Sequence, residues 1–114
     1  KREGDNLHQE LYISFAEAAL GTHKEIPTVG GKVKIKVDAG TQSGKILRLS
    51  KKGLPSIDSY GTGDMFVHIN VWTPQNLSKE QKEFFEKQLA NGEMQAEPSG
   101  KEKTFFEKVR DLFD

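Results

Sequence analysis

The stretch that decides the fold is Gly63–Thr73, which reads GDMFVHINVWT. Its apolar residues recur at every second position, which is the pattern of a β-strand with one buried face. The predicted inner row is Met65, Val67, Ile69 and Val71, and the outer row is Phe66, His68, Asn70 and Trp72. Pro74 ends the strand because proline has no N–H to donate to a sheet. We therefore predict the strongest strand of a mostly β domain here.

The residues before this strand predict further β structure. Residues 7–15 alternate in the same way, with Leu7, Leu11, Ile13 and Phe15 on one face and Gln9 as the polar break in that row. The other predicted elements are one or two helical turns over 15–21, strands over 22–28 and 32–37 joined by a tight turn at Gly30-Gly31, and a short strand over 45–49. Together they predict a small, mostly β domain over residues 1–75, with a short helix after its first strand.

Residues 76–114 change to a helical pattern. Ser78-Lys79-Glu80-Gln81 is a capping box, in which the serine oxygen accepts an early helical N–H and the glutamine reaches back. This helix is predicted to end at Asn91-Gly92, a common helix stop. Its apolar edge consists of Phe84, Phe85 and Leu89. Residues 93–103 are polar and predict a linker.

A second capping box, Thr104-Phe105-Phe106-Glu107, begins a predicted tail helix. Its apolar face consists of Phe105, Phe106, Val109, Leu112 and Phe113. Full burial of five such side chains contributes about 10 kcal/mol gross, whereas association costs about 4–15 kcal/mol. We therefore expect the tail and the edge of the preceding helix to form a homodimer interface together. Docking of the tail on its own domain is the alternative.

The composition narrows the function classes. The chain has 114 residues, of which 34% are hydrophobic, so the core of such a small domain is thin. The 17 basic and 17 acidic residues balance, which argues against a nucleic-acid binder. No apolar run is long enough to predict a membrane span. Cysteine is absent, which excludes disulfides and thiolate metal sites and fits a reducing compartment. Because the chain starts at Lys1 without methionine, we expect a piece of a longer protein.

The motifs that could carry chemistry are weak. The segment Gly40–Lys45 has three residues between its glycines where a phosphate-binding loop has four, and Ile46 stands where that loop has Ser or Thr. His8, His23 and His68 are scattered along the sequence and share no metal-ligand spacing. We therefore expect a non-catalytic domain with surface histidines, no cofactor and no metal. Nucleotide binding at the glycine loop is the enzymatic alternative.

Several short motifs resemble the carboxyl-terminal part of DnaJ-type co-chaperones of the bacterial type. Their order and spacing also agree, and they span most of the chain up to Gln81. The matching stretches are Arg2–Leu7, Phe15–Gly21, Ile26–Lys34, Ala39–Lys45, Lys52–Pro55, Gly63–Met65 and Thr73–Ser78. The tail around Phe105-Phe106 also resembles the end of these proteins.

The resemblance implies the second of two β-sandwich domains that bind unfolded client polypeptides, followed by dimerisation helices. In such proteins a J-domain stimulates a DnaK-type ATPase, and a Cys-rich domain holds zinc. Neither domain lies in this chain, so zinc is expected only elsewhere in the full-length protein. Phe66 and Trp72 are the candidate client contacts here, unless a helix or strand covers them. The resemblance thus predicts a cytoplasmic, dimeric co-chaperone, and a structural β-module without a client role is the alternative.

Overall fold

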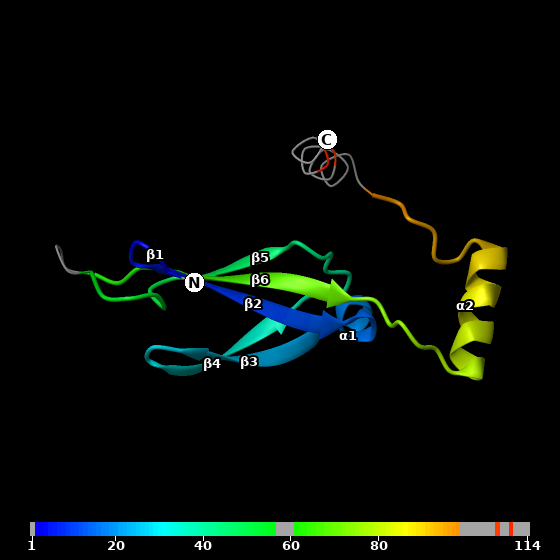
Figure 1. The fold of residues 1–114 in the computed structure, drawn as a ribbon, viewed down its shortest axis with the longest axis horizontal. Coiled ribbons are helices and arrows are strands. Elements are labelled where there is room, and N and C mark those ends of the chain that lie inside the picture. Colours follow the sequence, from blue (N-terminus) through cyan, green and yellow to red (C-terminus); the bar gives the residue numbers. More distant parts are fainter. Residues whose placement is uncertain (1, 57–60, 99–106, 108–109, 111–114) are drawn as a thin grey trace. The chain divides into compact units, whose positions relative to one another are not determined.

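The computed structural model describes residues 2–56, 61–98, 107 and 110. The chain divides into two compact units, Lys1–Gln75 and Asn76–Asp114, and each is described by itself. The first unit contains the strands β1 (Arg2–Glu3), β2 (Asn6–Ser14), β3 (Thr22–Thr28), β4 (Gly31–Val37), β5 (Ile46–Leu49) and β6 (Met65–Trp72), and the helix α1 (Phe15–Leu20) (Figure 1). The mostly β fold with a short helix after the first long strand is confirmed.

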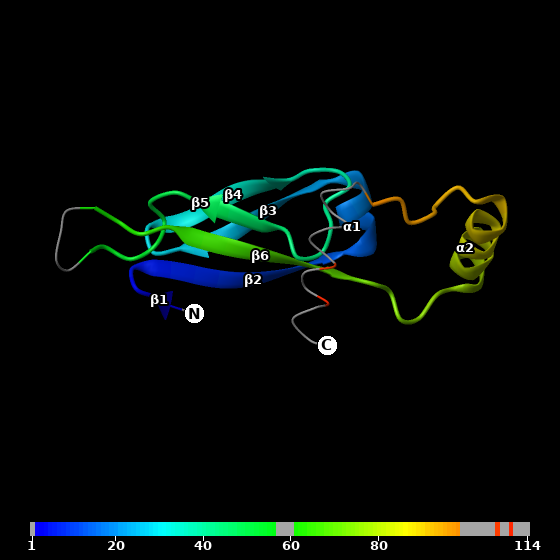
Figure 2. The ribbon, with the colours of Figure 1, turned by 90° about the horizontal axis from the view of Figure 1, so that it is seen from above.

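The larger sheet has four strands in the order β1-β2-β6-β5. β2 and β6 run side by side in the same direction (Figures 1 and 2), with Leu7 opposite Met65 and Ile13 opposite Val71. β5 is antiparallel to β6 on the other side. The two strands with the clearest alternation therefore pair at the centre of the sheet, although β6 follows β2 only after the rest of the first unit.

The smaller sheet is the hairpin of β3 and β4. Its last pair is Thr28 with Gly31, so the turn consists of Val29 and Gly30, one residue earlier than the predicted Gly30-Gly31. Gly31 begins β4 with a φ of 120°, a conformation that other residues rarely adopt. This register places Ile26 opposite Val33, so that the apolar residues of both strands share one face.

The core lies between the two sheets. Its buried side chains come from the inner rows of β2, β3, β4 and β6 and from α1: Ile13, Ala18, Ile26, Ile35, Val37, Met65, Val67 and Ile69. Leu47 and Leu49 of β5 pack against this cluster. The inner row predicted for the Gly63–Thr73 stretch is confirmed at Met65, Val67 and Ile69. Both sheets bury one face against the other, which is the sandwich arrangement.

The helix α1 turns the chain from the large sheet to the hairpin. Ser14 caps it, because the Ser14 hydroxyl accepts from the Glu17 N–H and the Glu17 carboxylate accepts from the Ser14 N–H. Phe15, predicted as the last inner residue of the strand, is instead the first residue of the helix and is exposed. The capping box stops the strand at Ser14, so the alternation ends one residue earlier.

The second unit contains the helix α2 (Lys79–Asn91). Ser78 and Gln81 form the predicted capping box, and Gly92 ends the helix in the left-handed conformation. Both predicted ends of this helix are confirmed. In the tail, only Glu107 and Arg110 are described, and both are helical. The residues predicted for the tail interface, Phe105, Phe106, Val109, Leu112 and Phe113, lie outside the described residues.

Candidate functional site

Among the described residues of the first unit, the largest group of aromatic side chains lies on the outer face of the four-stranded sheet, turned away from the hairpin. It arises from the strand period of two, because residues that alternate with the core point to the opposite side. We define the outer face by the outward-pointing residues of three strands. They are His8, Glu10, Tyr12 and Ser14 of β2, Ile46 and Arg48 of β5, and Phe66, His68, Asn70 and Trp72 of β6. The register places these side chains in rows across three strands.

Tyr12 and Trp72 lie together at one end of the outer face. Their rings meet edge to face with centroids 6.5 Å apart. Tyr12 is 64% exposed and Trp72 is 56% exposed, although aromatic side chains of this size are usually largely buried. This end of the sheet therefore presents two aromatic surfaces to the surroundings.

His8, Phe66 and His68 lie together toward the other end. The His8 ring stacks on Phe66 with centroids 5.2 Å apart and an interplanar angle of 20°. His8 Nδ1 lies 2.8 Å from His68 Nε2, so the two imidazoles share a hydrogen bond. The two histidines are 60 positions apart in sequence, and the structure brings them into contact although the sequence predicted scattered surface histidines.

Charged groups border the aromatic groups. The Arg48 Nε donates to the Asp64 carboxylate over 2.7 Å, and the Lys51 N–H donates to the same carboxylate. The hydrogen bond from the Lys51 backbone and the Arg48 guanidinium together lower the pKa of the Asp64 carboxyl. The Asn70 amide donates to the Glu10 carboxylate across the β2–β6 pair. The outer face is thus amphipathic, with aromatic groups beside paired polar groups.

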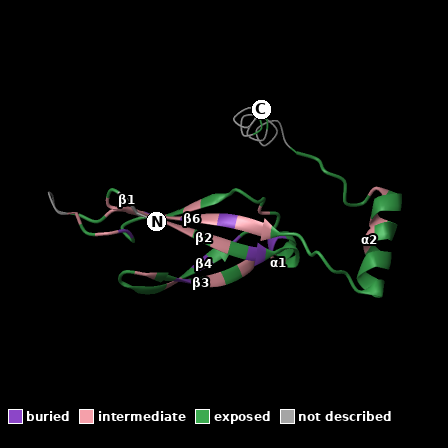
Figure 3. Ribbon diagram, viewed as in Figure 1, coloured by how far each residue is buried: buried purple, intermediate pink, exposed green. Residues whose placement is uncertain are grey.

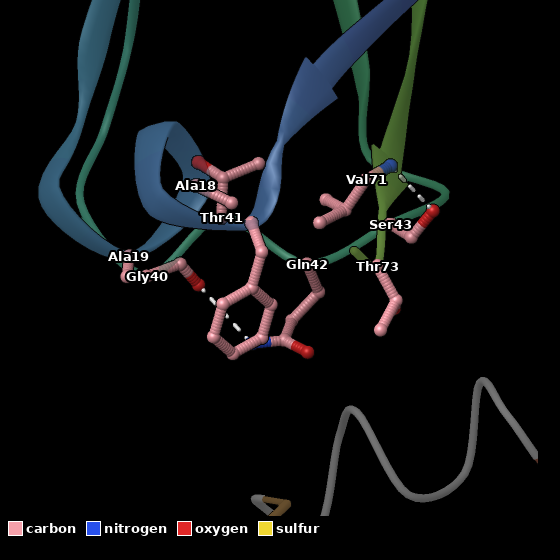
Figure 4. Close-up of a pocket in the computed structure, with 9 residues that line it drawn as sticks. Ala18, Ala19, Gly40, Thr41, Gln42, Ser43, Val71 and Thr73 are labelled. Carbon is pink, nitrogen blue, oxygen red and sulfur yellow. Dashed lines mark hydrogen bonds between the residues drawn. The ribbon is translucent and has the colours of Figure 1, made fainter. Parts of the chain in front are cut away.

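A groove lies at the end of the first unit where α1, the loop after β4 and the end of β6 meet (Figure 4). Its volume is about 500 Å³. It is lined by Phe15, Ala18, Ala19, Gly40, Thr41, Gln42, Ser43, Val71 and Thr73. The Ser43 hydroxyl accepts from the Val71 N–H and the Gln42 amide donates to the Gly40 carbonyl. The polar side chains of the loop are therefore used to hold the loop itself.

The loop Gly40–Lys45 is the segment for which nucleotide binding was the alternative hypothesis. The Gly44 N–H donates to the Ile69 carbonyl over 2.8 Å, so this donor of the loop is already used within the sheet. The segment leads into the strand β5 and not into a helix, whose N-terminus a phosphate-binding loop needs. The loop geometry therefore does not favour a phosphate site.

The helix α2, which carries the apolar edge predicted from the sequence, is exposed over most of its length (Figure 3). Phe84 is 52% exposed, Leu89 is 85% exposed, and none of the described residues of the helix is buried. The Phe84 and Phe85 rings meet edge to face at 5.5 Å. A helix of 13 residues with no buried side chain is marginal in water. The exposed side chains of Phe84 and Leu89 are thus accessible from the surroundings.

Comparison with known proteins decides the family. Residues 1–74 match the family model described as "DnaJ C terminal domain". The chain belongs to the DnaJ C-terminal domain family. This DnaJ C-terminal domain is also 50% identical over 113 residues to a protein of Bacteroides fragilis named "Chaperone protein DnaJ". It is 40% identical over 115 residues to the protein of that name from Salinibacter ruber, and 47% identical over 116 residues to that from Neisseria meningitidis.

These matches cover 99–100% of the chain and only 28–31% of each relative. The family resemblance of the sequence is therefore confirmed for the domain, while the relatives contain further sequence. In the described part of the chain, no helix is long and apolar enough to cross a membrane.

The predicted client contacts of this DnaJ C-terminal domain lie where the alternation placed them. Trp72 is exposed on the outer face, and Phe66 is partly buried beside His8. Within the described residues of the first unit, no element covers Trp72. The sequence did not single out Tyr12 and Ile46, because alternation shows which side a residue faces but not which strand lies next to it. The register with β6 is what joins them to Trp72 and His68.

Proposed function

We propose that the chain is the client-binding and dimerising part of a DnaJ-type co-chaperone, and that its outer face binds apolar segments of unfolded polypeptides. The observation that supports this most directly is the exposed pair of Tyr12 and Trp72. In a chain with only 34% hydrophobic residues, two large aromatic side chains on one exposed face are unusual and typical of an interaction surface.

The chemistry of the outer face suits segments without a fixed sequence. Aromatic rings offer large apolar surfaces at a low cost in side-chain entropy, because each has only two rotatable side-chain bonds. The neighbouring Glu10, Asn70 and Arg48 can bind backbone or polar groups of the same segment. A small surface of this kind gives weak and reversible binding, which a protein that hands clients on requires.

The second unit supports dimerisation in the same proposal. Phe84 and Leu89 are exposed on α2, as is typical of side chains that pack against a partner. We propose that this edge, with Phe85 and the tail residues Phe105, Phe106, Val109, Leu112 and Phe113, forms the homodimer interface. Two copies would then meet around a two-fold axis through the same residues of each chain.

The remaining parts of the proposal concern the longer protein. Its partner would be a DnaK-type ATPase, stimulated by a J-domain outside this chain, and zinc would be held by a Cys-rich domain that is also outside it. The absence of cysteine from the chain supports a reducing compartment, which in bacteria is the cytoplasm. We propose no catalysis for this domain, since its relatives are named as chaperones.

The client proposal is tested by binding of a permanently unfolded, fluorescently labelled polypeptide to the 114-residue chain. Trp72→Ala is expected to raise the dissociation constant about tenfold, which corresponds to about 1.4 kcal/mol. Val29→Ala is the matched control, because Val29 is 62% exposed but lies in the turn of the other sheet. Equal affinities of the two variants would contradict the proposal and favour a structural β-module without a client role.

A further inference from the structure

Three side chains with metal-ligand chemistry stand on adjacent strands of the outer face. His8 and Glu10 lie two residues apart on β2, and His68 of β6 is directly opposite Glu10. Neighbouring strands of a sheet lie about 4.7–4.9 Å apart, so opposite side chains on one face are close to each other. His8, Glu10 and His68 therefore form a triangle, and its two imidazoles already approach within 2.8 Å at their nitrogens.

We propose that His8, His68 and Glu10 bind a divalent transition-metal ion, with Zn²⁺ as the representative. Two imidazole nitrogens and one carboxylate oxygen are a donor set that zinc accepts, with water completing the tetrahedron. With Zn–N bonds of about 2.0–2.1 Å, the two nitrogens around a tetrahedral ion lie about 3.3 Å apart. The present distance of 2.8 Å thus has to open by only about half an ångström.

Binding of the ion requires a change of tautomer in one of the two imidazoles. In the imidazole pair, one nitrogen carries the hydrogen and the other accepts it. In the metal-bound pair, both of these nitrogens offer lone pairs to the ion, so the hydrogen between them moves to the other nitrogen of its own ring and both imidazoles stay neutral. The proposal departs from our expectation of a chain without a metal site, which rested on a sequence where 60 positions separate the two histidines.

The third ligand has to turn toward the pair. The Glu10 carboxylate accepts a hydrogen bond from the Asn70 amide, and among the described residues no three His, Cys, Asp or Glu side chains already converge on one point. Glu10 is exposed, so its rotation costs one surface hydrogen bond. The ion therefore binds two imidazoles that already lie together, and the Glu10 carboxylate rotates toward it as the third ligand.

The neighbours of the pair favour this arrangement. Phe66 stacks on the His8 ring and limits its rotation. Ile46 is opposite His68 on the other side and adds an apolar flank. The nearest cation of the face, Arg48, is held by the Asp64 carboxylate. Its positive charge is thus largely compensated.

The test is calorimetric titration of Zn²⁺ into the full chain, with Mg²⁺ as the negative control ion. One-to-one binding is expected, and His68→Gln and His8→Gln should each weaken it at least about tenfold. Glu10→Gln should weaken it less, since Glu10 supplies only the mobile ligand. Asn70→Ala should leave it equal or tighter, because it releases the Glu10 carboxylate.

His23→Gln is the matched control, since His23 is exposed on β3 of the other sheet and should not change zinc binding. Circular dichroism identifies any variant that does not fold, and the other histidine variant then decides. Absence of saturable Zn²⁺ binding, binding that survives both His8→Gln and His68→Gln, or equal loss with His23→Gln would each overturn the proposal.

Discussion

Gly63 lies so close to Asp5 that a Cβ atom on residue 63 would be 2.1 Å from the Asp5 carbonyl oxygen. The contact joins the two ends of the first unit in sequence. The Gly63 N–H donates to the Leu54 carbonyl, and the Leu54 N–H donates to the same Asp5 carbonyl oxygen over 2.8 Å. The segment before β6 is thus fixed to the residue just before β2 through backbone atoms, which cannot move aside as a side chain could.

Gly63→Ala is therefore expected to destabilise the first unit by about 3 kcal/mol, because the added methyl group would overlap the backbone of Asp5. The measurement is urea unfolding followed by circular dichroism. Gly30→Ala is the control, since a Cβ at Gly30 meets nothing within 4 Å, and its effect should stay within about 0.5 kcal/mol. Equal stabilities of the two variants would show that the close approach is not a constraint.

Glu17 should make the fold sensitive to acid. Its hydrogen bonds with Lys24, at 2.7 Å, and with the Ser14 backbone lower the pKa of the Glu17 carboxyl from 4.5 to about 2. A lowered pKa in the folded state means stabilisation that is present above pH 4.5 and is lost as the pH falls toward 2. The difference in Tm between the wild type and Glu17→Gln is therefore expected to be largest near neutral pH and to vanish near pH 2.

Thermal melts between pH 7 and pH 2 measure this difference. Glu25→Gln removes an exposed carboxylate of β3 and controls for the change in net charge. A wild-type advantage over Glu17→Gln that persists undiminished at pH 2 would be the contrary result.

Ser78→Ala is expected to reduce the helix content of the second unit. Ser78 accepts from the Gln81 N–H, and loss of such a cap costs about 1 kcal/mol. Because none of the described residues of α2 is buried, packing within the chain cannot compensate for the loss. The helix signal in circular dichroism should fall, whereas Lys82→Ala on the exposed surface of the same helix should preserve it. Equal helix signals would argue against a role of the cap.

Leu89→Asp is expected to weaken self-association of the chain at least about tenfold in sedimentation equilibrium, since it places a charge in the proposed interface. Leu20→Asp is the matched control, because Leu20 is 81% exposed in the first unit and Leu89 is 85% exposed in the second. Removal of residues 103–114 should also give monomers. A wild-type chain that is monomeric at all concentrations would contradict the dimer proposal.

The sequence predicted the inner and outer sides of the strands well, because alternation depends only on neighbouring residues. Val67 and Ile69 are buried and Trp72 is exposed, as the period of two required. It also predicted both ends of α2, since the Ser78 cap and the Gly92 stop are local signals. The position of the hairpin turn was wrong by one residue. Two adjacent glycines fit either turn, and the packing of Ile26 and Val33 on one face decides between the two registers.

The outer face could not be predicted from neighbouring residues in the sequence alone. Alternation placed His8 and His68 on polar rows but could not show that these rows become one surface. That follows from the parallel pairing of β2 with β6, which sets Glu10 opposite His68. Tyr12 was missed for the same reason, since its aromatic partner, Trp72, belongs to the other strand.

The parallel pairing also governs how the domain is made. During synthesis β2 leaves the ribosome long before β6, because 60 positions separate His8 from His68. At about 5–20 residues per second, β2 waits roughly 3–12 s for its neighbour. Throughout this interval Leu11 and Ile13 have no strand to pair with. A domain proposed to bind unfolded polypeptides is therefore itself incompletely folded for part of its own translation.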